Sequence, residues 1–161
     1  YGLARHDAAR NERIPLAERV EAALALIEAD LREQGIRVAI AGDARPVVEG
    51  DPVLLEQVLF NLLRNAADSM RDTPAARRRL ELSIGIVDGY ASLAVADAGC
   101  GIDPGIADKL FDPLFTTKKE GLGMGLAVCR SVVENHRGRL WFEPNPGGGT
   151  VFHLLLPLSS P

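Results

Sequence analysis

Four polar side chains recur at helical spacing within the apolar segment 51–68, at Gln57, Asn61, Asn65 and Asp68. On a helix they would share one face, and the leucine-rich positions between them would cover the opposite face. A solvated helix face usually carries Lys, Glu and Arg, whereas Asn is a poor helix former. Two Asn residues one turn apart therefore indicate that this face binds a ligand.

Two glycine-rich segments further along the chain predict what that ligand is. Residues 97–102 read Asp-Ala-Gly-Cys-Gly-Ile after an alternating apolar run, and residues 121–126 read Gly-Leu-Gly-Met-Gly-Leu near the start of a predicted helix. Closely spaced glycines let backbone amides approach anionic oxygens, and a helix N-terminus favours negative charge. Phosphate groups fit both requirements. Neither segment is a Walker loop, and no G-x-G-x-x-G follows the first predicted strand, so the two common nucleotide-binding folds are disfavoured.

The hydrophobic periodicity predicts the elements that would position these segments. In chain order it indicates a helix over 16–33, strands over 36–41 and 46–48, a helix beginning after 51, a hairpin of strands 80–87 and 90–96, a short helix near 105–110, a helix over 123–135, and a strand pair over 139–143 and 150–156. Gly35 is expected to end the first helix, and Asp51 to cap the next one ahead of a proline. Asp88-Gly89 is a two-residue hairpin signal. The Gly- and Pro-rich stretch 98–122 is long for a loop in a compact domain, which is typical of a lid.

Composition limits the class of protein. The chain has 161 residues, 47% of them hydrophobic and 25% charged, which suits one well-buried domain. Its net charge of -4 gives no basic footprint for nucleic acid or an anionic membrane, and the run 77–79 of three arginines is expected to be a solvated turn. No apolar run approaches membrane-spanning length, so we expect a cytoplasmic location without direct membrane contact. Cys100 and Cys129 lack metal-ligand spacing and are expected to be free thiols, the first in a loop and the second in a helix core.

Several motifs occur in a fixed order between residues 51 and 152. They are Asn-Leu-Leu-Arg-Asn-Ala at 61–66, Asp-Ala-Gly-Cys-Gly at 97–101, Phe-Asp-Pro-Leu-Phe-Thr-Thr-Lys at 111–118, Gly-Leu-Gly-Met-Gly-Leu at 121–126 and Gly-Thr-Val-Phe at 149–152. Together they resemble the asparagine, glycine and phenylalanine boxes of the catalytic ATP-binding domain of bacterial sensor histidine kinases. That domain has the Bergerat ATP fold, which DNA gyrase, the MutL repair proteins and the heat-shock chaperone ATPases share. The details at Asp68, 116–118 and 121–125 are similar to the oxygen- and nitrogen-sensing subgroup.

The resemblance implies a fold, cofactors and contacts. The fold is α+β, a two-layer α/β sandwich in which a mixed, mostly antiparallel sheet packs on three helices, with a long ATP lid. The cofactors are ATP and Mg²⁺, with Asp97 accepting a hydrogen bond from the adenine amino group, Thr150 beside it, and Asn65 ligating the metal. The residues implied to be catalytic are Asn61, Asn65 and Lys118. The residues implied to bind the nucleotide are Asn61, Asn65, Asp68, Asp97, Gly99, Gly101, Ile102, Phe115, Thr116, Thr117, Lys118, Lys119, Gly121, Leu122, Gly123, Met124, Gly125, Leu126 and Thr150.

The lid has implied roles of its own. Phe111 and Phe115 would anchor it against the domain. Many members of the family carry Lys or Arg where this chain has Asp68, so neutralising the phosphates would depend on the lid lysines or on Arg64. Leu114 and Leu122 also differ from the common pattern.

Asn61 distinguishes the branches of the family. In the hydrolytic relatives this position is Glu, a general base that activates water. An amide cannot take up a proton at neutral pH, whereas a neutral imidazole is itself a nucleophile. Asn61 therefore favours phosphoryl transfer to a histidine.

The resemblance also implies partners. Of the three histidines, His6 lacks a helical hairpin, His136 is expected at a helix end, and His153 lies within a predicted strand. We therefore expect residues 1–14 to be a linker from a phosphoacceptor domain of the same dimeric protein, and 15–161 to be the catalytic domain. A response regulator receiver domain would take the phosphoryl group onward.

Other interpretations compete with this one. A stand-alone ATPase of the gyrase type is disfavoured by Asn61, as is an anti-sigma-like serine kinase. A non-catalytic regulatory module would be expected to lose some of the motifs. Taken singly, Asn65 is most simply a capping residue, Asp97 a turn former and Lys118 a solvated charge; only their combination favours the kinase.

Overall fold

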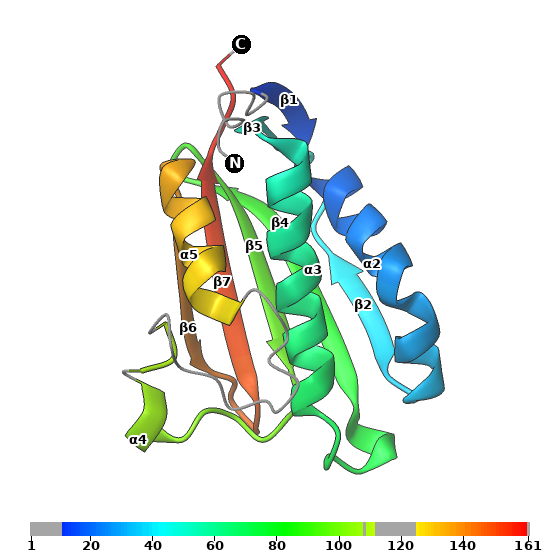
Figure 1. Cartoon of the computed structure of the whole chain (residues 1–161). Helices are drawn as coiled ribbons and strands as arrows, with labels where there is room; N and C mark the ends of the chain where they lie inside the picture. Colours follow the sequence, from blue (N-terminus) through cyan, green and yellow to red (C-terminus); the bar gives the residue numbers. More distant parts are fainter. Residues whose placement is uncertain (1–10, 108, 112–124, 161) are drawn as a thin grey trace, which may run out of the picture.

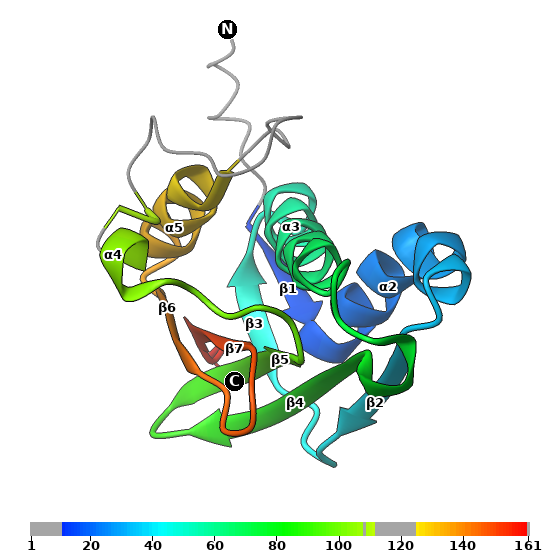
Figure 2. The same ribbon diagram turned by 90° about the horizontal axis from the view of Figure 1, so that it is seen from below.

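The computed structural model describes residues 11–107, 109–111 and 125–160. It has two layers, a five-stranded sheet and three long helices on one face of that sheet (Figures 1 and 2). The helices are α2 (Leu16–Glu33), α3 (Pro52–Ser69) and α5 (Gly125–Asn135). The strands lie in the order β2 (Arg37–Ala41), β4 (Arg79–Val87), β5 (Tyr90–Asp97), β7 (Thr150–Pro157) and β6 (Arg139–Pro144). The predicted two-layer α+β sandwich is therefore confirmed.

The sheet is mixed, as predicted. β2 runs parallel to β4, and every other neighbouring pair is antiparallel. A separate two-stranded sheet pairs β1 (Glu12–Pro15) with β3 (Val47–Gly50). We did not predict β1, because four residues ending in proline give almost no periodic signal. It begins inside the segment expected to be a linker, and its Ile14 is buried in the core.

The helix α3 has the two faces that its sequence predicts. Its N-cap is Asp51, whose Oδ1 accepts hydrogen bonds from the backbone N–H groups of Val53 (3.0 Å) and Leu54 (3.3 Å). Its buried side chains are Leu55, Val58, Leu59, Leu62, Leu63, Ala66 and Ala67. The opposite face, with Asn61 and Asn65, is therefore turned away from the core.

The turn between β4 and β5 is the tight turn that Asp88-Gly89 predicts. Both residues have positive φ, 50° and 84°, and Val87 pairs with Tyr90 directly across the hairpin. The same backbone geometry ends α2, where Gly35 has φ 68°.

The basic run 77–79 differs from its prediction. Arg78 is partly buried, and its guanidinium donates to the backbone carbonyls of Gln34 (2.8 Å), Arg71 (2.9 Å) and Thr73 (2.8 Å). Its five donors suit the joining of several carbonyls, so Arg78 connects the end of α2 to the segment after α3. The prediction of a solvated turn was wrong for this residue.

Strand β5 carries the core row that leads to the site. Ala91, Leu93 and Val95 point into the core at alternate positions, and Asp97 takes the next inward position at the strand end. A short helix, α4 (Pro104–Ala107), follows near the predicted 105–110. Within the described residues, no helix combines the length and the apolar character that crossing a bilayer requires.

Candidate functional site

Asp97 is a buried carboxylate, with 3% of its surface exposed. Its Oδ1 accepts hydrogen bonds from the backbone N–H of Gly99 (2.8 Å) and of Thr150 (3.2 Å). Thr150 is 4% exposed and is the first residue of β7. A buried carboxylate is tolerated when backbone donors hold it, and such donors also fix the direction of the side chain. The structure thus brings Thr150 beside Asp97, with a polar group held at the end of an apolar strand.

The loop after Asp97 is tied to the C-terminal end of α3. The N–H of Cys100 donates to the carbonyl of Ser69 (3.2 Å), and the hydroxyl of Thr73 donates to the carbonyl of Ala98 (3.1 Å). A side chain at Gly99 would place its Cβ 2.3 Å from the Ser69 Oγ, so only glycine allows this approach. The polar face of α3 and the buried Asp97 are therefore parts of one region.

Asn61 lies on the side of α3 that faces α5. Its Nδ2 donates to the Sγ of Cys129 at 3.7 Å. Burial raises the pKa of the Cys129 thiol, so the sulfur stays neutral and acts as a weak acceptor. Asn65 follows one turn later on the same half-buried face. Cys129 and Cys100 are free, buried and exposed respectively, as the sequence predicts.

Two other residues of this helix are directed elsewhere. Arg64 pairs with Asp30 of α2 (3.2 Å) and lies over the ring of Phe60. Asp68 pairs with Arg71 (3.4 Å) and lines a shallow hollow with Arg64 on the α2 side. Arg64 thus contacts α2 and Asp68 contacts Arg71, and the roles of both residues toward a nucleotide stay predictions.

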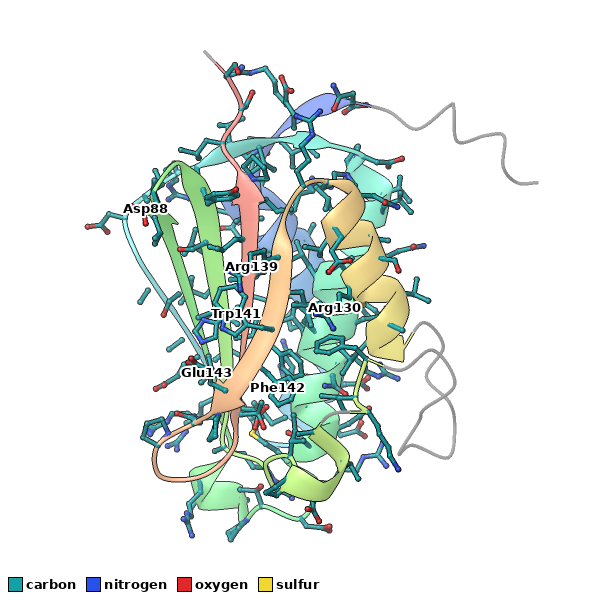
Figure 3. All side chains as sticks on the ribbon, turned by 90° about the vertical axis from the view of Figure 1, so that its left-hand side faces the viewer. Asp88, Arg130, Arg139, Trp141, Phe142 and Glu143 are labelled. Atoms are coloured by element: carbon teal, nitrogen blue, oxygen red, sulfur yellow. The ribbon has the colours of Figure 1, made fainter. Side chains whose placement is uncertain are left out.

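The described residues 101–107 and 109–111 continue from this region toward β6 and α5. Gly101 has φ 77°, which L-residues rarely adopt, and Ile102 packs partly buried against the core. At their end, Phe111 packs on Phe142 of β6 (ring centroids 6.0 Å apart), and Arg130 of α5 lies over the Phe111 ring at 4.6 Å. Figure 3 shows Arg130 on α5 and Phe142 on the neighbouring strand β6. Phe111, midway along the predicted lid, is thus anchored against β6 and α5.

The rest of the predicted lid is not described. Of the predicted nucleotide-binding residues, Phe115, Thr116, Thr117, Lys118, Lys119, Gly121, Leu122, Gly123 and Met124 lie outside the described residues. Gly125 opens α5 with φ 66°, and Leu126 packs partly buried against the core. Among the described candidates, hydrogen bonds join Asp97 to Gly99 and Thr150, and join Asn61 to Cys129 of α5.

A separate groove of about 1130 Å³ lies between β1, α2 and α3. Its lining includes the exposed Leu26 and Val53, together with Phe60, Gln57 and Asn61. The volume would suit a small ligand. None of the lining residues comes from β5, β7 or α5, and Asn61 is the one described candidate residue that lines this groove.

Comparisons with known proteins agree with this geometry. Residues 50–160 match the family described as histidine kinase-, DNA gyrase B- and HSP90-like ATPase. The chain is 40% identical over 146 residues to the C4-dicarboxylate transport sensor protein DctS of Rhodobacter capsulatus, covering 90% of this chain and 22% of DctS. It is 38% identical over 146 residues to the sensor protein FixL of Bradyrhizobium diazoefficiens, covering 88% of this chain and 28% of FixL. The chain thus spans about a quarter of the length of these relatives.

Solved structures give the same answer. The nucleotide-free catalytic domain of the histidine kinase ThkA superposes with a TM-score of 0.81 at 28% identity, over 91% of this chain and 95% of that one. ThkA in complex with the response regulator protein TrrA matches with a TM-score of 0.79 at 25% identity, over 94% of this chain and 42% of the other. By motifs, fold and likeness, the chain belongs to the histidine kinase-, gyrase B- and HSP90-like ATPase family and is a catalytic domain of the sensor histidine kinase type.

Proposed function

We propose that this domain binds MgATP at the Asp97 region and transfers the γ-phosphoryl group to a histidine on a separate phosphoacceptor domain. The observation that carries the proposal is the buried Asp97 carboxylate, held by two backbone N–H groups at the end of β5 beside the asparagine face of α3. A structural role alone would not require the charge of a carboxylate, because the amide oxygen of an Asn could accept from the same two N–H groups.

Adenine recognition follows from the chemistry of Asp97. An ionised carboxylate only accepts hydrogen bonds, and the exocyclic amino group of adenine donates them. Guanine presents a carbonyl oxygen in the corresponding position, so the same carboxylate would repel it. The site therefore favours ATP over GTP.

Mg²⁺ fits an amide oxygen of α3. The described residues contain no group of three or more His, Cys, Asp or Glu side chains that could hold a metal ion. Mg²⁺ bound through one protein oxygen, water and phosphate oxygens needs no such group. Asn65 would supply that oxygen, and the ion would neutralise charge on the phosphates.

Transfer to another domain follows from Asn61 and from the histidines. Asn61 cannot act as a general base, which disfavours hydrolysis. The ring of His136 makes hydrogen bonds with Asp51 and Val132. The ring of His153 contacts the Glu143 carboxylate and stacks on Trp141. His6 lies outside the described residues. We place the acceptor histidine, the receiver domain of a response regulator and a cytoplasmic setting in the full-length dimeric protein, with 1–14 as linker and 15–161 as catalytic domain.

Calorimetric titration of MgATP tests the proposal, with Asp97→Asn as the variant and Asp88→Asn, the same chemical change in the distant β4–β5 turn, as control. We expect Asp97→Asn to weaken binding about tenfold to a hundredfold, because it replaces a charged acceptor. Asp88→Asn should bind as the wild type does. Equal binding by Asp97→Asn and wild type would contradict the proposed site. Magnesium-dependent hydrolysis by the isolated domain would instead favour a stand-alone ATPase.

A further inference from the structure

The turn between β6 and β7 reaches across to Asp97 through one side chain. The Nδ2 of Asn145 donates to the backbone carbonyl of Asp97 at 2.8 Å, joining residues 48 positions apart. The turn itself is closed by backbone bonds, from Asn145 N–H to the Gly149 carbonyl (3.0 Å) and from Gly148 N–H to the Asn145 carbonyl (2.9 Å). The side chain of Asn145 is therefore not needed to close the turn.

This contact stands where the β5–β7 ladder ends. The last ladder pair on that side is Ala96 with Val151, so the next carbonyl of β5 lies beyond the ladder. The Asn145 amide donates to it in place of a strand backbone. On its other side, Asp97 pairs with Leu80 of β4. The backbone of Asp97 is therefore held by β4 on one side and by the Asn145 side chain on the other.

The rest of the turn fits closely around the same residue. A Cβ at Gly149 would lie 2.0 Å from the Asp97 carbonyl oxygen and 2.9 Å from its Oδ1. Thr150, the next residue, donates its N–H to that same Oδ1. The position of this turn and the direction of the Asp97 carboxylate are thus coupled.

We propose that Asn145 is a positioning residue for base recognition: its amide holds the Asp97 peptide so that the carboxylate points at the adenine amino group. This inference rests on the proposed function, since it concerns how the same site selects its base. Because Asn145 acts through Asp97, its loss should reduce the preference for adenine more than it reduces nucleotide binding in general.

The test compares ATP with GTP affinity, measured by calorimetry, for wild type, Asn145→Asp and Asn145→Ala. Asn145→Asp keeps the size and turn propensity of the residue but sets an acceptor against the Asp97 carbonyl. We expect it to weaken ATP binding about tenfold with little change for GTP, and Asn145→Ala to weaken ATP binding about threefold. The control is Asp88→Asn, the reverse exchange in the β4–β5 turn, at the opposite end of the sheet from Glu143 and the β6–β7 turn (Figure 3). It should leave both affinities unchanged.

The outcomes separate the two proposals. Equal losses for ATP and GTP, or no loss, in folded Asn145 variants would overturn the positioning role while leaving the kinase assignment intact. A wild-type domain that binds no MgATP would overturn the proposed function and this inference with it. If circular dichroism shows that Asn145→Asp does not fold, the ratio of ATP affinity to GTP affinity of Asn145→Ala decides instead.

Discussion

Each end of the sheet has a turn that contains glycine and joins two antiparallel strands, but the groups around the two turns differ. At one end, which we call the hairpin end, lie the Asp88-Gly89 turn, the start of α3 and His136. At the other, the Asp97 end, lie Asp97, the turn 145–149 and the loop 98–101. The hairpin end connects elements to each other, whereas the Asp97 end holds a buried carboxyl group and its backbone donors. Turns that contain glycine thus connect elements at one end and hold a buried carboxylate in place at the other.

Substituting the glycines of the two turns should give the largest expected difference, which is a difference in the free energy of unfolding. Gly149→Ala would put a Cβ on the Asp97 carbonyl at φ 104°, whereas a Cβ at Gly89, φ 84°, meets nothing within 4 Å. We expect Gly149→Ala to cost about 3 kcal/mol or more and Gly89→Ala about 1–2 kcal/mol, the cost of the left-handed backbone alone. Urea unfolding monitored by circular dichroism measures both. Equal losses would show that the Asp97 end is not the more tightly constrained of the two.

His136 gives a smaller effect confined to the hairpin end. Its Nε2 accepts from the Asp51 N–H (3.1 Å) and its Nδ1 lies 2.8 Å from the Val132 carbonyl, which requires the neutral ring with the proton on Nδ1. His136→Leu removes both bonds and should lower the free energy of unfolding by about 1–3 kcal/mol. ATP affinity at 25 °C should be unchanged, because the loss is remote from Asp97.

The matched variant for this position is His136→Gln, whose side-chain oxygen can still accept from Asp51. It should regain part of the stability. A large fall in ATP affinity for folded His136→Leu would mean that the two ends are coupled and would break the comparison.

The smallest expected effect is a difference in thiol reactivity between the two cysteines. Cys100 is exposed in the loop of the Asp97 end, while Cys129 is buried with a raised pKa and so has less thiolate. Iodoacetamide at neutral pH should label Cys100 alone in the folded domain, as read by mass spectrometry of peptides. Bound MgATP should slow that labelling. Faster labelling of Cys129 would contradict the packing between α3 and α5.

Local signals predicted much of this arrangement. The Asp51 cap, the Asp88-Gly89 turn and the face of α3 were predicted because each depends on residues within a few positions. The position of Asp97 at a strand end was predicted because the alternating run stops at this carboxylate and glycines follow it. Each of these features was local in the chain.

The missed features depend on partners far away in the sequence. Asn145 reads as a turn residue until its bond to Asp97 is seen, and His136 joins Asp51 across 85 positions. Arg78 looks like one of three solvated arginines, although it holds three carbonyls. A single sequence carries no local signal for such contacts, because the same residue types are also common in exposed turns.

Amide chemical-shift mapping with ¹⁵N-labelled domain tests most directly that nucleotide binds at the Asp97 end. MgATP should shift the amides of Gly99, Gly101 and Thr150 strongly and leave Gly89 and Leu158, at the hairpin end, unmoved. Shifts concentrated instead at Glu18, Arg19 and Val53, which line the groove between β1, α2 and α3, would contradict the account.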